Sequence, residues 1–223
     1  NEPMNKLCST GGVDAYGMVG LKLYSDELKT GTNLLEFNSQ TGKTKDAYGE
    51  IGGALKLKYN DTVLTYGDQF PNTPVLAVST VRLLPSTATG YSIQDKTFDN
   101  LTINAAHFYR MNPVDSTDHL NYFTSDYGPG AGIKSNSMTY IGGTYKHNNV
   151  NYTAYMSQLE DVWNQYYFGA NTQFKLAKDG HSLRFATSNY YNHESGDETY
   201  GKIDALALSA MAGYQINNHV FSL

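Results

Sequence analysis

The chain of 223 residues has little cysteine, little tryptophan and no long apolar run. Its one cysteine, Cys8, excludes an internal disulfide framework and a cysteine-based zinc site. Mean hydropathy is -0.47, and no apolar stretch approaches the ~20 residues with which a helix crosses the hydrocarbon core of a membrane. A helical membrane protein is therefore excluded, whereas a protein that crosses with strands, which need only alternate apolar residues, is not.

The charge pattern excludes other classes. The net charge is -5 without a basic block or a long acidic run, so nucleic acid is not an expected partner. The six histidines have no spacing typical of a metal site, and we expect no cofactor. Residues 1–6 are polar and lack the apolar core of a signal peptide. Both chain ends fall close to strand-like sequence, which favours a fragment.

Tyrosine is abundant instead. The 19 tyrosines outnumber the nine phenylalanines and the single Trp163. A tyrosine ring prefers an apolar or interfacial setting, while its hydroxyl needs a polar partner. A surplus of tyrosine is therefore typical of a surface that meets both lipid and water.

The connections between strand-length segments alternate in length. Asn, Asp and Gly, which tolerate the positive φ of tight hairpins, predict very short turns at one end. These turns are Asn60-Asp61, Asp99-Asn100, Asn148-Asn149, Asp179-Gly180 and Asn217-Asn218. The other connections are polar and of very unequal length: 25–48, 71–87, 112–136, 160–162 and 194–201. Strict alternation predicts tight turns at one end of a sheet and elaborate loops at the other, as in outer-membrane barrels.

The segments themselves have a period of two, which is the period of a strand. In residues 163–176, Tyr166, Phe168 and Phe174 fall on one face, and Gln165, Asn171 and Lys175 fall on the other. Residues 13–23 and 50–59 behave alike. The pattern predicts one face toward lipid and one toward water, although a half-buried soluble sheet would give the same alternation.

Segment length favours the membrane. Several segments run about ten residues or more, enough to cross a bilayer at the usual tilt, whereas soluble strands centre on about five or six. We count about eleven strands. The predicted fold class is all-β, a transmembrane antiparallel up-and-down β-barrel of porin type. A sheet left open in hydrocarbon would expose unpaired amides, so we expect further strands in a longer parent chain. A soluble β-sandwich binding module, such as an adhesin, is the alternative.

Short motifs in consistent order resemble the OprD family of outer-membrane porins. The motifs are Val81-Arg82-Leu83-Leu84-Pro85, Thr87-Ala88-Thr89-Gly90-Tyr91, Ala106-His107-Phe108, Tyr140-Ile141-Gly142-Gly143, Leu159-Glu160-Asp161 and Gln165-Tyr166-Tyr167. The similarity extends back to Asp14-Ala15-Tyr16-Gly17 and forward to His219-Val220-Phe221, so it covers nearly the whole chain. Each motif is weak alone, and their order carries the resemblance.

The resemblance implies one partial barrel domain over residues 1–223, about half of an eighteen-stranded barrel, in the bacterial outer membrane. It implies passive uptake of small carboxylate-bearing solutes, organic acids or amino acids, by a monomer or a loose homotrimer. Outer-membrane lipid and lipopolysaccharide would surround it. In this family a loop folds into the lumen and narrows it; here that constriction loop is residues 71–88, with Leu83, Leu84 and Pro85 beside Arg82.

Fixed cations in a narrow pore replace the hydration that an anion loses, and arginine holds a carboxylate with two parallel hydrogen bonds. We therefore predict Arg82 at the constriction, with Lys22, Lys56, Lys58 and Lys175 facing the lumen by strand alternation. Alternatively, Arg82 only pins its loop and each lysine is a solvated wall residue. Ser79-Thr80-Val81 supplies no acid to hold a substrate amine, which favours simple carboxylates.

A weaker hypothesis is enzymatic. Proteolytic activity has been attributed within the family to a Ser-His-Asp set, and the matching positions are His107 and Asp161. The matching serine would lie beyond Leu223, and a triad requires a contact that strands so far apart are not expected to provide. The predicted function is therefore a channel and not an enzyme, with His107 an ordinary wall residue and Asp161 a turn residue as the structural alternatives.

Overall fold

The computed structural model describes residues 9–24, 34–35, 37–38, 41–114, 116–124, 132–176 and 180–222. All regular secondary structure in these residues is β-strand. None of the described residues forms a helix long and apolar enough to cross a membrane.

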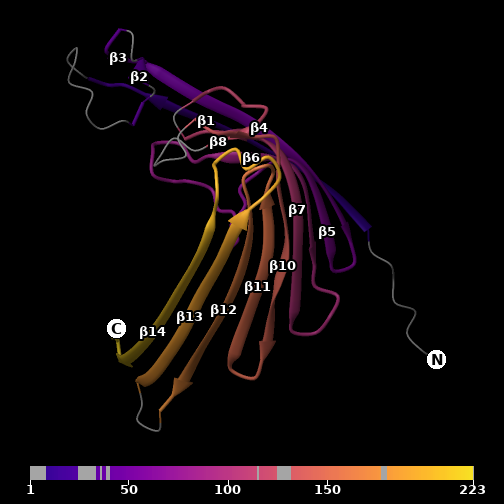
Figure 1. Cartoon of the computed structure of the whole chain (residues 1–223), viewed down its shortest axis with the longest axis vertical. Helices are drawn as coiled ribbons and strands as arrows, with labels where there is room; N and C mark the ends of the chain where they lie inside the picture. Colours follow the sequence, from indigo (N-terminus) through magenta and orange to yellow (C-terminus); the bar gives the residue numbers. More distant parts are fainter. Residues whose placement is uncertain are drawn as a thin grey trace.

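One antiparallel sheet of eleven strands dominates the structure (Figure 1). Its order is β1-β4-β5-β6-β7-β10-β11-β12-β13-β14-β15. The bounds are β1 Ser9–Leu21, β4 Ala47–Tyr59, β5 Thr62–Gln69, β6 Thr87–Asp95, β7 Leu101–Asn112, β10 Met138–His147, β11 Val150–Leu159, β12 Trp163–Lys175, β13 His181–Glu194, β14 Asp204–Ile216 and β15 His219–Ser222. The expected eleven strands in an up-and-down order are confirmed.

Two small hairpins accompany the sheet. They are β2 Phe37–Asn38 with β3 Lys43–Thr44, and β8 Phe123–Thr124 with β9 Lys134–Ser135. Both lie within long connections, and the sequence did not predict them. Neither packs as a second layer of comparable size, so in the described part of the chain the β-sandwich alternative is wrong.

Strand length agrees with a membrane-spanning sheet. β1, β4, β12 and β14 have 13 residues each and β13 has 14, against about five or six for a soluble strand. At ~3.3 Å per residue, 13 residues extend about 43 Å along the strand. Strands of this length cross a hydrocarbon core even with the tilt of a barrel wall.

The short turns follow the sequence at three sites. Asn60, Asn148 and Asn217 each begin a two-residue turn with φ of 51°. The turn at Asp99-Asn100 was predicted too short, because the connection covers residues 96–100. Asp95 lengthens it by accepting hydrogen bonds from the amide and hydroxyl of Thr97. Gly180 has φ of 75°, while Asp179 lies outside the described residues.

The sheet has two chemically different faces. The inner face is the one that carries Tyr48, Glu50, Phe108, Tyr140, Tyr155 and Tyr190. The outer face carries Ile51, Leu55, Tyr66, His107, Ile141, Met156, Tyr166 and Phe168. Large apolar side chains on the outer face are exposed, as with Ile51 at 83% and Leu208 at 70%.

The connections sort by end as expected. The long connections gather at the end of the sheet drawn uppermost in Figure 1, and the tight turns lie at the opposite end. The β11–β12 connection, residues 160–162, is short but lies at the end with long connections, and Asp161 takes φ of 58° there. The largest buried cluster, around Phe108, Tyr140 and Tyr155, lies on the inner face.

The turns predict a measurable effect. Replacing Asn148 by Ala should lower the free energy of unfolding by about 1 kcal/mol, because alanine tolerates positive φ less well than asparagine. Replacing Asn148 by Gly should not destabilise, since glycine has no Cβ to clash. Urea unfolding of the protein refolded into micelles measures both, and equal stability of the Ala and Gly variants would contradict the assignment.

Candidate functional site

The connection between β5 and β6, residues 70–86, crosses the inner face of the sheet. The hydroxyl of Tyr48, in β4, accepts a hydrogen bond of 3.1 Å from the amide of Leu84. The hydroxyl of Tyr190, in β13, donates at 3.1 Å to the carbonyl of Pro74. Val75 and Leu76 pack against the buried cluster of the wall. Because β4 and β13 are second and ninth in the strand order, this connection, called the inner connection below, bridges most of the sheet's width.

The base of the inner connection is held by a buried carboxylate. Glu50 is 3% exposed and accepts hydrogen bonds of 2.7 Å from Tyr16 and from Thr87. The ring of Tyr16 in turn lies 5.1 Å from that of Phe70, where the connection begins. Two hydroxyl donors satisfy an acid that would otherwise be costly to bury. Glu50 therefore ties β1 and β4 to the start of β6.

The wall opens where the inner connection leaves it. β4 pairs with β1 along its whole length but with β5 only from Ala54 to Tyr59. Above that point the amide of Gly53 donates to Asp68 at 3.2 Å, and Asp68 also accepts from Thr89 at 2.6 Å. Gly67, at φ of 126°, makes the bend that turns Asp68 into this gap. Side-chain oxygens thus replace part of the missing backbone pairing.

A cavity of about 530 Å³ lies between the inner connection and the wall. Its wall is polar and aromatic. Asn104 donates to Tyr155 at 2.9 Å and accepts from Gln94 at 3.0 Å, and Lys56 pairs with Asp14. Such a surface can hydrate or bind a small polar solute.

The predicted constriction residues lie in the inner connection. Leu84 is buried beside Tyr48, and Leu83 lies over Gly20. A side chain at position 20 would collide with Leu83, so glycine there lets the connection approach β1. Arg82 and Pro85 are half-buried. Arg82 has interactions with its surroundings.

The four predicted lysines have different environments. Lys22 lies just beyond β1 and pairs with Asp46, and its hydrogen bond holds the pKa of Asp46 below the ordinary value. Lys56 faces inward in its pair with Asp14. Lys58 and Lys175 are exposed on the inner face near the short turns. The structure therefore does not gather the four lysines into one cluster.

Two further cations on the inner face were missed by the sequence reasoning. The register places Lys146 of β10 and Arg184 of β13 on this face, and Arg184 donates to Gln215 at 2.7 Å. The period-two alternation of the sequence contained the signal for both residues. Counting in twos from Tyr140 leads to Lys146, and counting from Tyr190 leads to Arg184.

His107 and Asp161 do not form a catalytic pair. The His107 ring lies on the outer face, and its Nδ1 is 2.8 Å from the hydroxyl of Thr139. Asp161 lies in the turn after β11, where its carboxylate accepts from the amide of Asp197 at 3.2 Å. Two strand spacings, about 10 Å, separate β7 from β11. The enzymatic hypothesis is therefore wrong.

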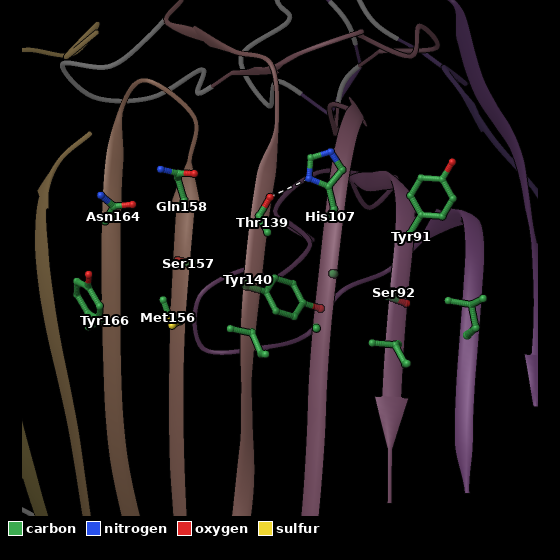
Figure 2. A pocket seen from close by; sticks show the side chains of 15 residues that line it. Tyr91, Ser92, His107, Thr139, Tyr140, Met156, Ser157, Gln158, Asn164 and Tyr166 are labelled. Carbon is green, nitrogen blue, oxygen red and sulfur yellow. Dashed lines mark hydrogen bonds between the residues drawn. The ribbon is translucent and has the colours of Figure 1, made fainter. Parts of the chain in front are cut away.

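A second concavity lies on the outer face, with a volume of about 680 Å³. Figure 2 shows Tyr91 and Tyr166 on its two sides, and His107, Thr139, Gln158 and Asn164 along one end. Its floor is apolar and includes Ala105 and Ile141. No acidic residue lines it. This cavity is separated from the inner one by the sheet.

Loss of the Tyr48 hydroxyl tests how the inner connection is held. In a Tyr48→Phe variant the buried amide of Leu84 loses its acceptor, which costs about 1 kcal/mol, or about fivefold in local opening. Hydrogen exchange of peptides covering residues 80–86 should accelerate by that factor. Tyr59→Phe, at an exposed site on the outer face, is the control and should leave it unchanged. Equal exchange in wild type and Tyr48→Phe would rule the anchor out.

Known proteins share this architecture. The family model described as "outer membrane porin, OprD family" matches residues 10–223. Porin D of Pseudomonas aeruginosa is 35% identical over 213 residues, 95% of this chain and 47% of its own. The porin-like protein GalP of Pseudomonas putida is 25% identical and is covered over 50% of its length. The chain therefore spans about half the length of these curated relatives.

Solved structures agree. OccAB2 of Acinetobacter baumannii superposes with a TM-score of 0.90 at 30% identity, over 96% of this chain and 54% of that one. OpdK of Pseudomonas aeruginosa, solved with vanillate, superposes with a TM-score of 0.87 at 26% identity, over 96% of this chain and 55% of that one. The outer face of the sheet is accordingly its lipid face. By sequence and by fold, the chain belongs to the OprD family of outer membrane porins.

Proposed function

We propose that this chain forms part of a passive outer-membrane channel that takes up small carboxylate-bearing solutes. The observation that carries the proposal is the inner connection, which runs from Tyr48 to Tyr190 across the polar inner face. In a closed barrel this segment narrows the lumen and acts as its constriction loop. A solute must then pass between the connection and the opposite wall.

The charges on the inner face favour anions. Among the inner acids, Asp14 pairs with Lys56, whereas Glu50, which is buried, and Asp68 accept hydrogen bonds from neutral donors. The cations Lys58, Lys146 and Lys175 are exposed on the same face. These exposed lysines attract a dehydrated anion along its path.

Arg82 gives the selectivity a specific location. It lies in the inner connection next to Leu83 and Leu84, which contact the wall. Its guanidinium can hold a carboxylate by two parallel hydrogen bonds and release it to the next cation. The solved complex of the relative OpdK contains vanillate, which is a carboxylate. Residues 79–81 add no acid that would select for a substrate amine.

The parent protein would be an eighteen-stranded barrel, as a monomer or loose homotrimer, to which this chain contributes eleven strands. The linear order from β1 to β15 leaves both edge strands with one neighbour each. Unpaired backbone groups in hydrocarbon cost several kcal/mol each. Closure by further strands would satisfy them.

Arg82→Ala in the full-length porin tests the selectivity. The anion-to-cation permeability ratio, measured from the reversal potential across a planar bilayer under a salt gradient, should fall. Loss of roughly 1 kcal/mol of attraction corresponds to about fivefold. Arg82→Lys, which keeps the charge, should retain most of the ratio. A ratio unchanged in Arg82→Ala would leave Arg82 as a structural pin of its loop.

A further inference from the structure

We propose that the outer-face concavity is a binding site for a lipid of the outer leaflet, lipid A, with an acyl chain in the apolar floor and its phosphate at the polar end. The lipid face of a porin meets acyl chains everywhere, and a flat face has no preference among them. This part of the wall is instead hollow, with a volume of about 680 Å³. A hollow of defined polarity can select one amphiphile.

The floor is shaped by a short side chain between longer ones. Ala105 lies between Ile93 and Ile141 in neighbouring strands. Tyr91 and Tyr166 stand at the two sides (Figure 2). Their rings reach beyond the alanine methyl group and leave a trough. Apolar floor and aromatic walls suit a hydrocarbon chain, which gains contact on three sides instead of one.

The polar end is a continuous row across four strands. His107 pairs with Thr139, Thr139 with Gln158, and Gln158 with Asn164, all on the outer face. Polar groups facing hydrocarbon are costly, so this row marks the level at which the lipid headgroups begin. The next row toward the short turns is apolar, with Ile141 and Met156. The site thus changes from polar to apolar within one step of the strand.

The chemistry of the row suits a phosphate. His107 uses Nδ1 toward Thr139, at 2.8 Å, which leaves its Nε2 for another partner. The amides of Gln158 and Asn164 supply further donors, although Gln158 also donates to Ser195 at 3.0 Å. No carboxylate lines the concavity to repel an anion. These donors gather at the end with the long connections, where the headgroups of a single leaflet lie.

The aromatic residues around the concavity indicate its position along the membrane normal. Tyr66 stacks on Tyr91 with 4.7 Å between ring centroids, and Tyr109 lies 6.3 Å from Tyr91. Tyr166 stacks on Tyr191 at 6.3 Å. Such rings form a girdle at the membrane interface of barrels. The trough therefore begins at the girdle and extends into the outer leaflet.

The test is native mass spectrometry of the full-length porin extracted from the outer membrane in mild detergent. Ala105→Trp fills the trough, and His107→Ala removes a donor from the polar row. Ala154→Trp is the matched control, because Ala154 is exposed on the outer face two residues from Met156 but does not line the concavity. Heat-modifiable electrophoretic migration checks that each variant forms a barrel.

We expect wild type and Ala154→Trp to retain lipid A, and Ala105→Trp to reduce the retained fraction at least tenfold. His107→Ala should reduce the retained fraction less than Ala105→Trp does. It should also narrow the difference in retention between lipid A and dephosphorylated lipid A. Equal retention in all four proteins would overturn the proposal. Retention of phospholipid but not lipid A would also overturn it. A wild-type dimer that is lost in Ala105→Trp would overturn it as well, because the concavity would then bind a second copy of the porin.

Discussion

The structure depends on the need of every backbone amide in hydrocarbon to find a partner within the protein. Eleven strands meet it by antiparallel pairing, and pairing fixes the alternation of side chains between the two faces. Apolar residues such as Ile51 and Leu208 can then remain exposed because their surroundings are lipid. The inner face is free to carry the tyrosines, amides and charges that a soluble protein would place on its surface.

The inner connection leaves the wall where β4 and β5 stop pairing. Once residues 70–86 leave the wall, β4 loses its neighbour above Ala54, and Asp68 and Glu50 supply hydrogen bonds that the backbone no longer makes. The carboxylates of both acids are thereby satisfied by hydrogen-bond donors of the wall. The departure of the inner connection from the wall is therefore offset by local hydrogen bonds at its base.

Sequence periodicity predicted the strands, the order and the faces because a strand's period of two is a local property. Asn60, Asn148 and Asn217 were predicted turns because positive φ is local as well. The turn at Asp99-Asn100 was misjudged because Asp95 binds Thr97, a side-chain contact that local propensity does not register. Glu50 and the anchoring by Tyr190 could not be found, since their partners lie 37 and 116 residues away.

The two-faced wall is tested most directly along β12. Single cysteines at positions 165–170, in a Cys8→Ser background, would be probed in bilayers with a water-soluble thiol reagent, and a fluorophore at each would be quenched by brominated lipid. The account predicts lipid quenching at Tyr166, Phe168 and Ala170, and aqueous labelling at Gln165, Tyr167 and Gly169. The absence of alternation, or lipid quenching on both faces, would contradict it.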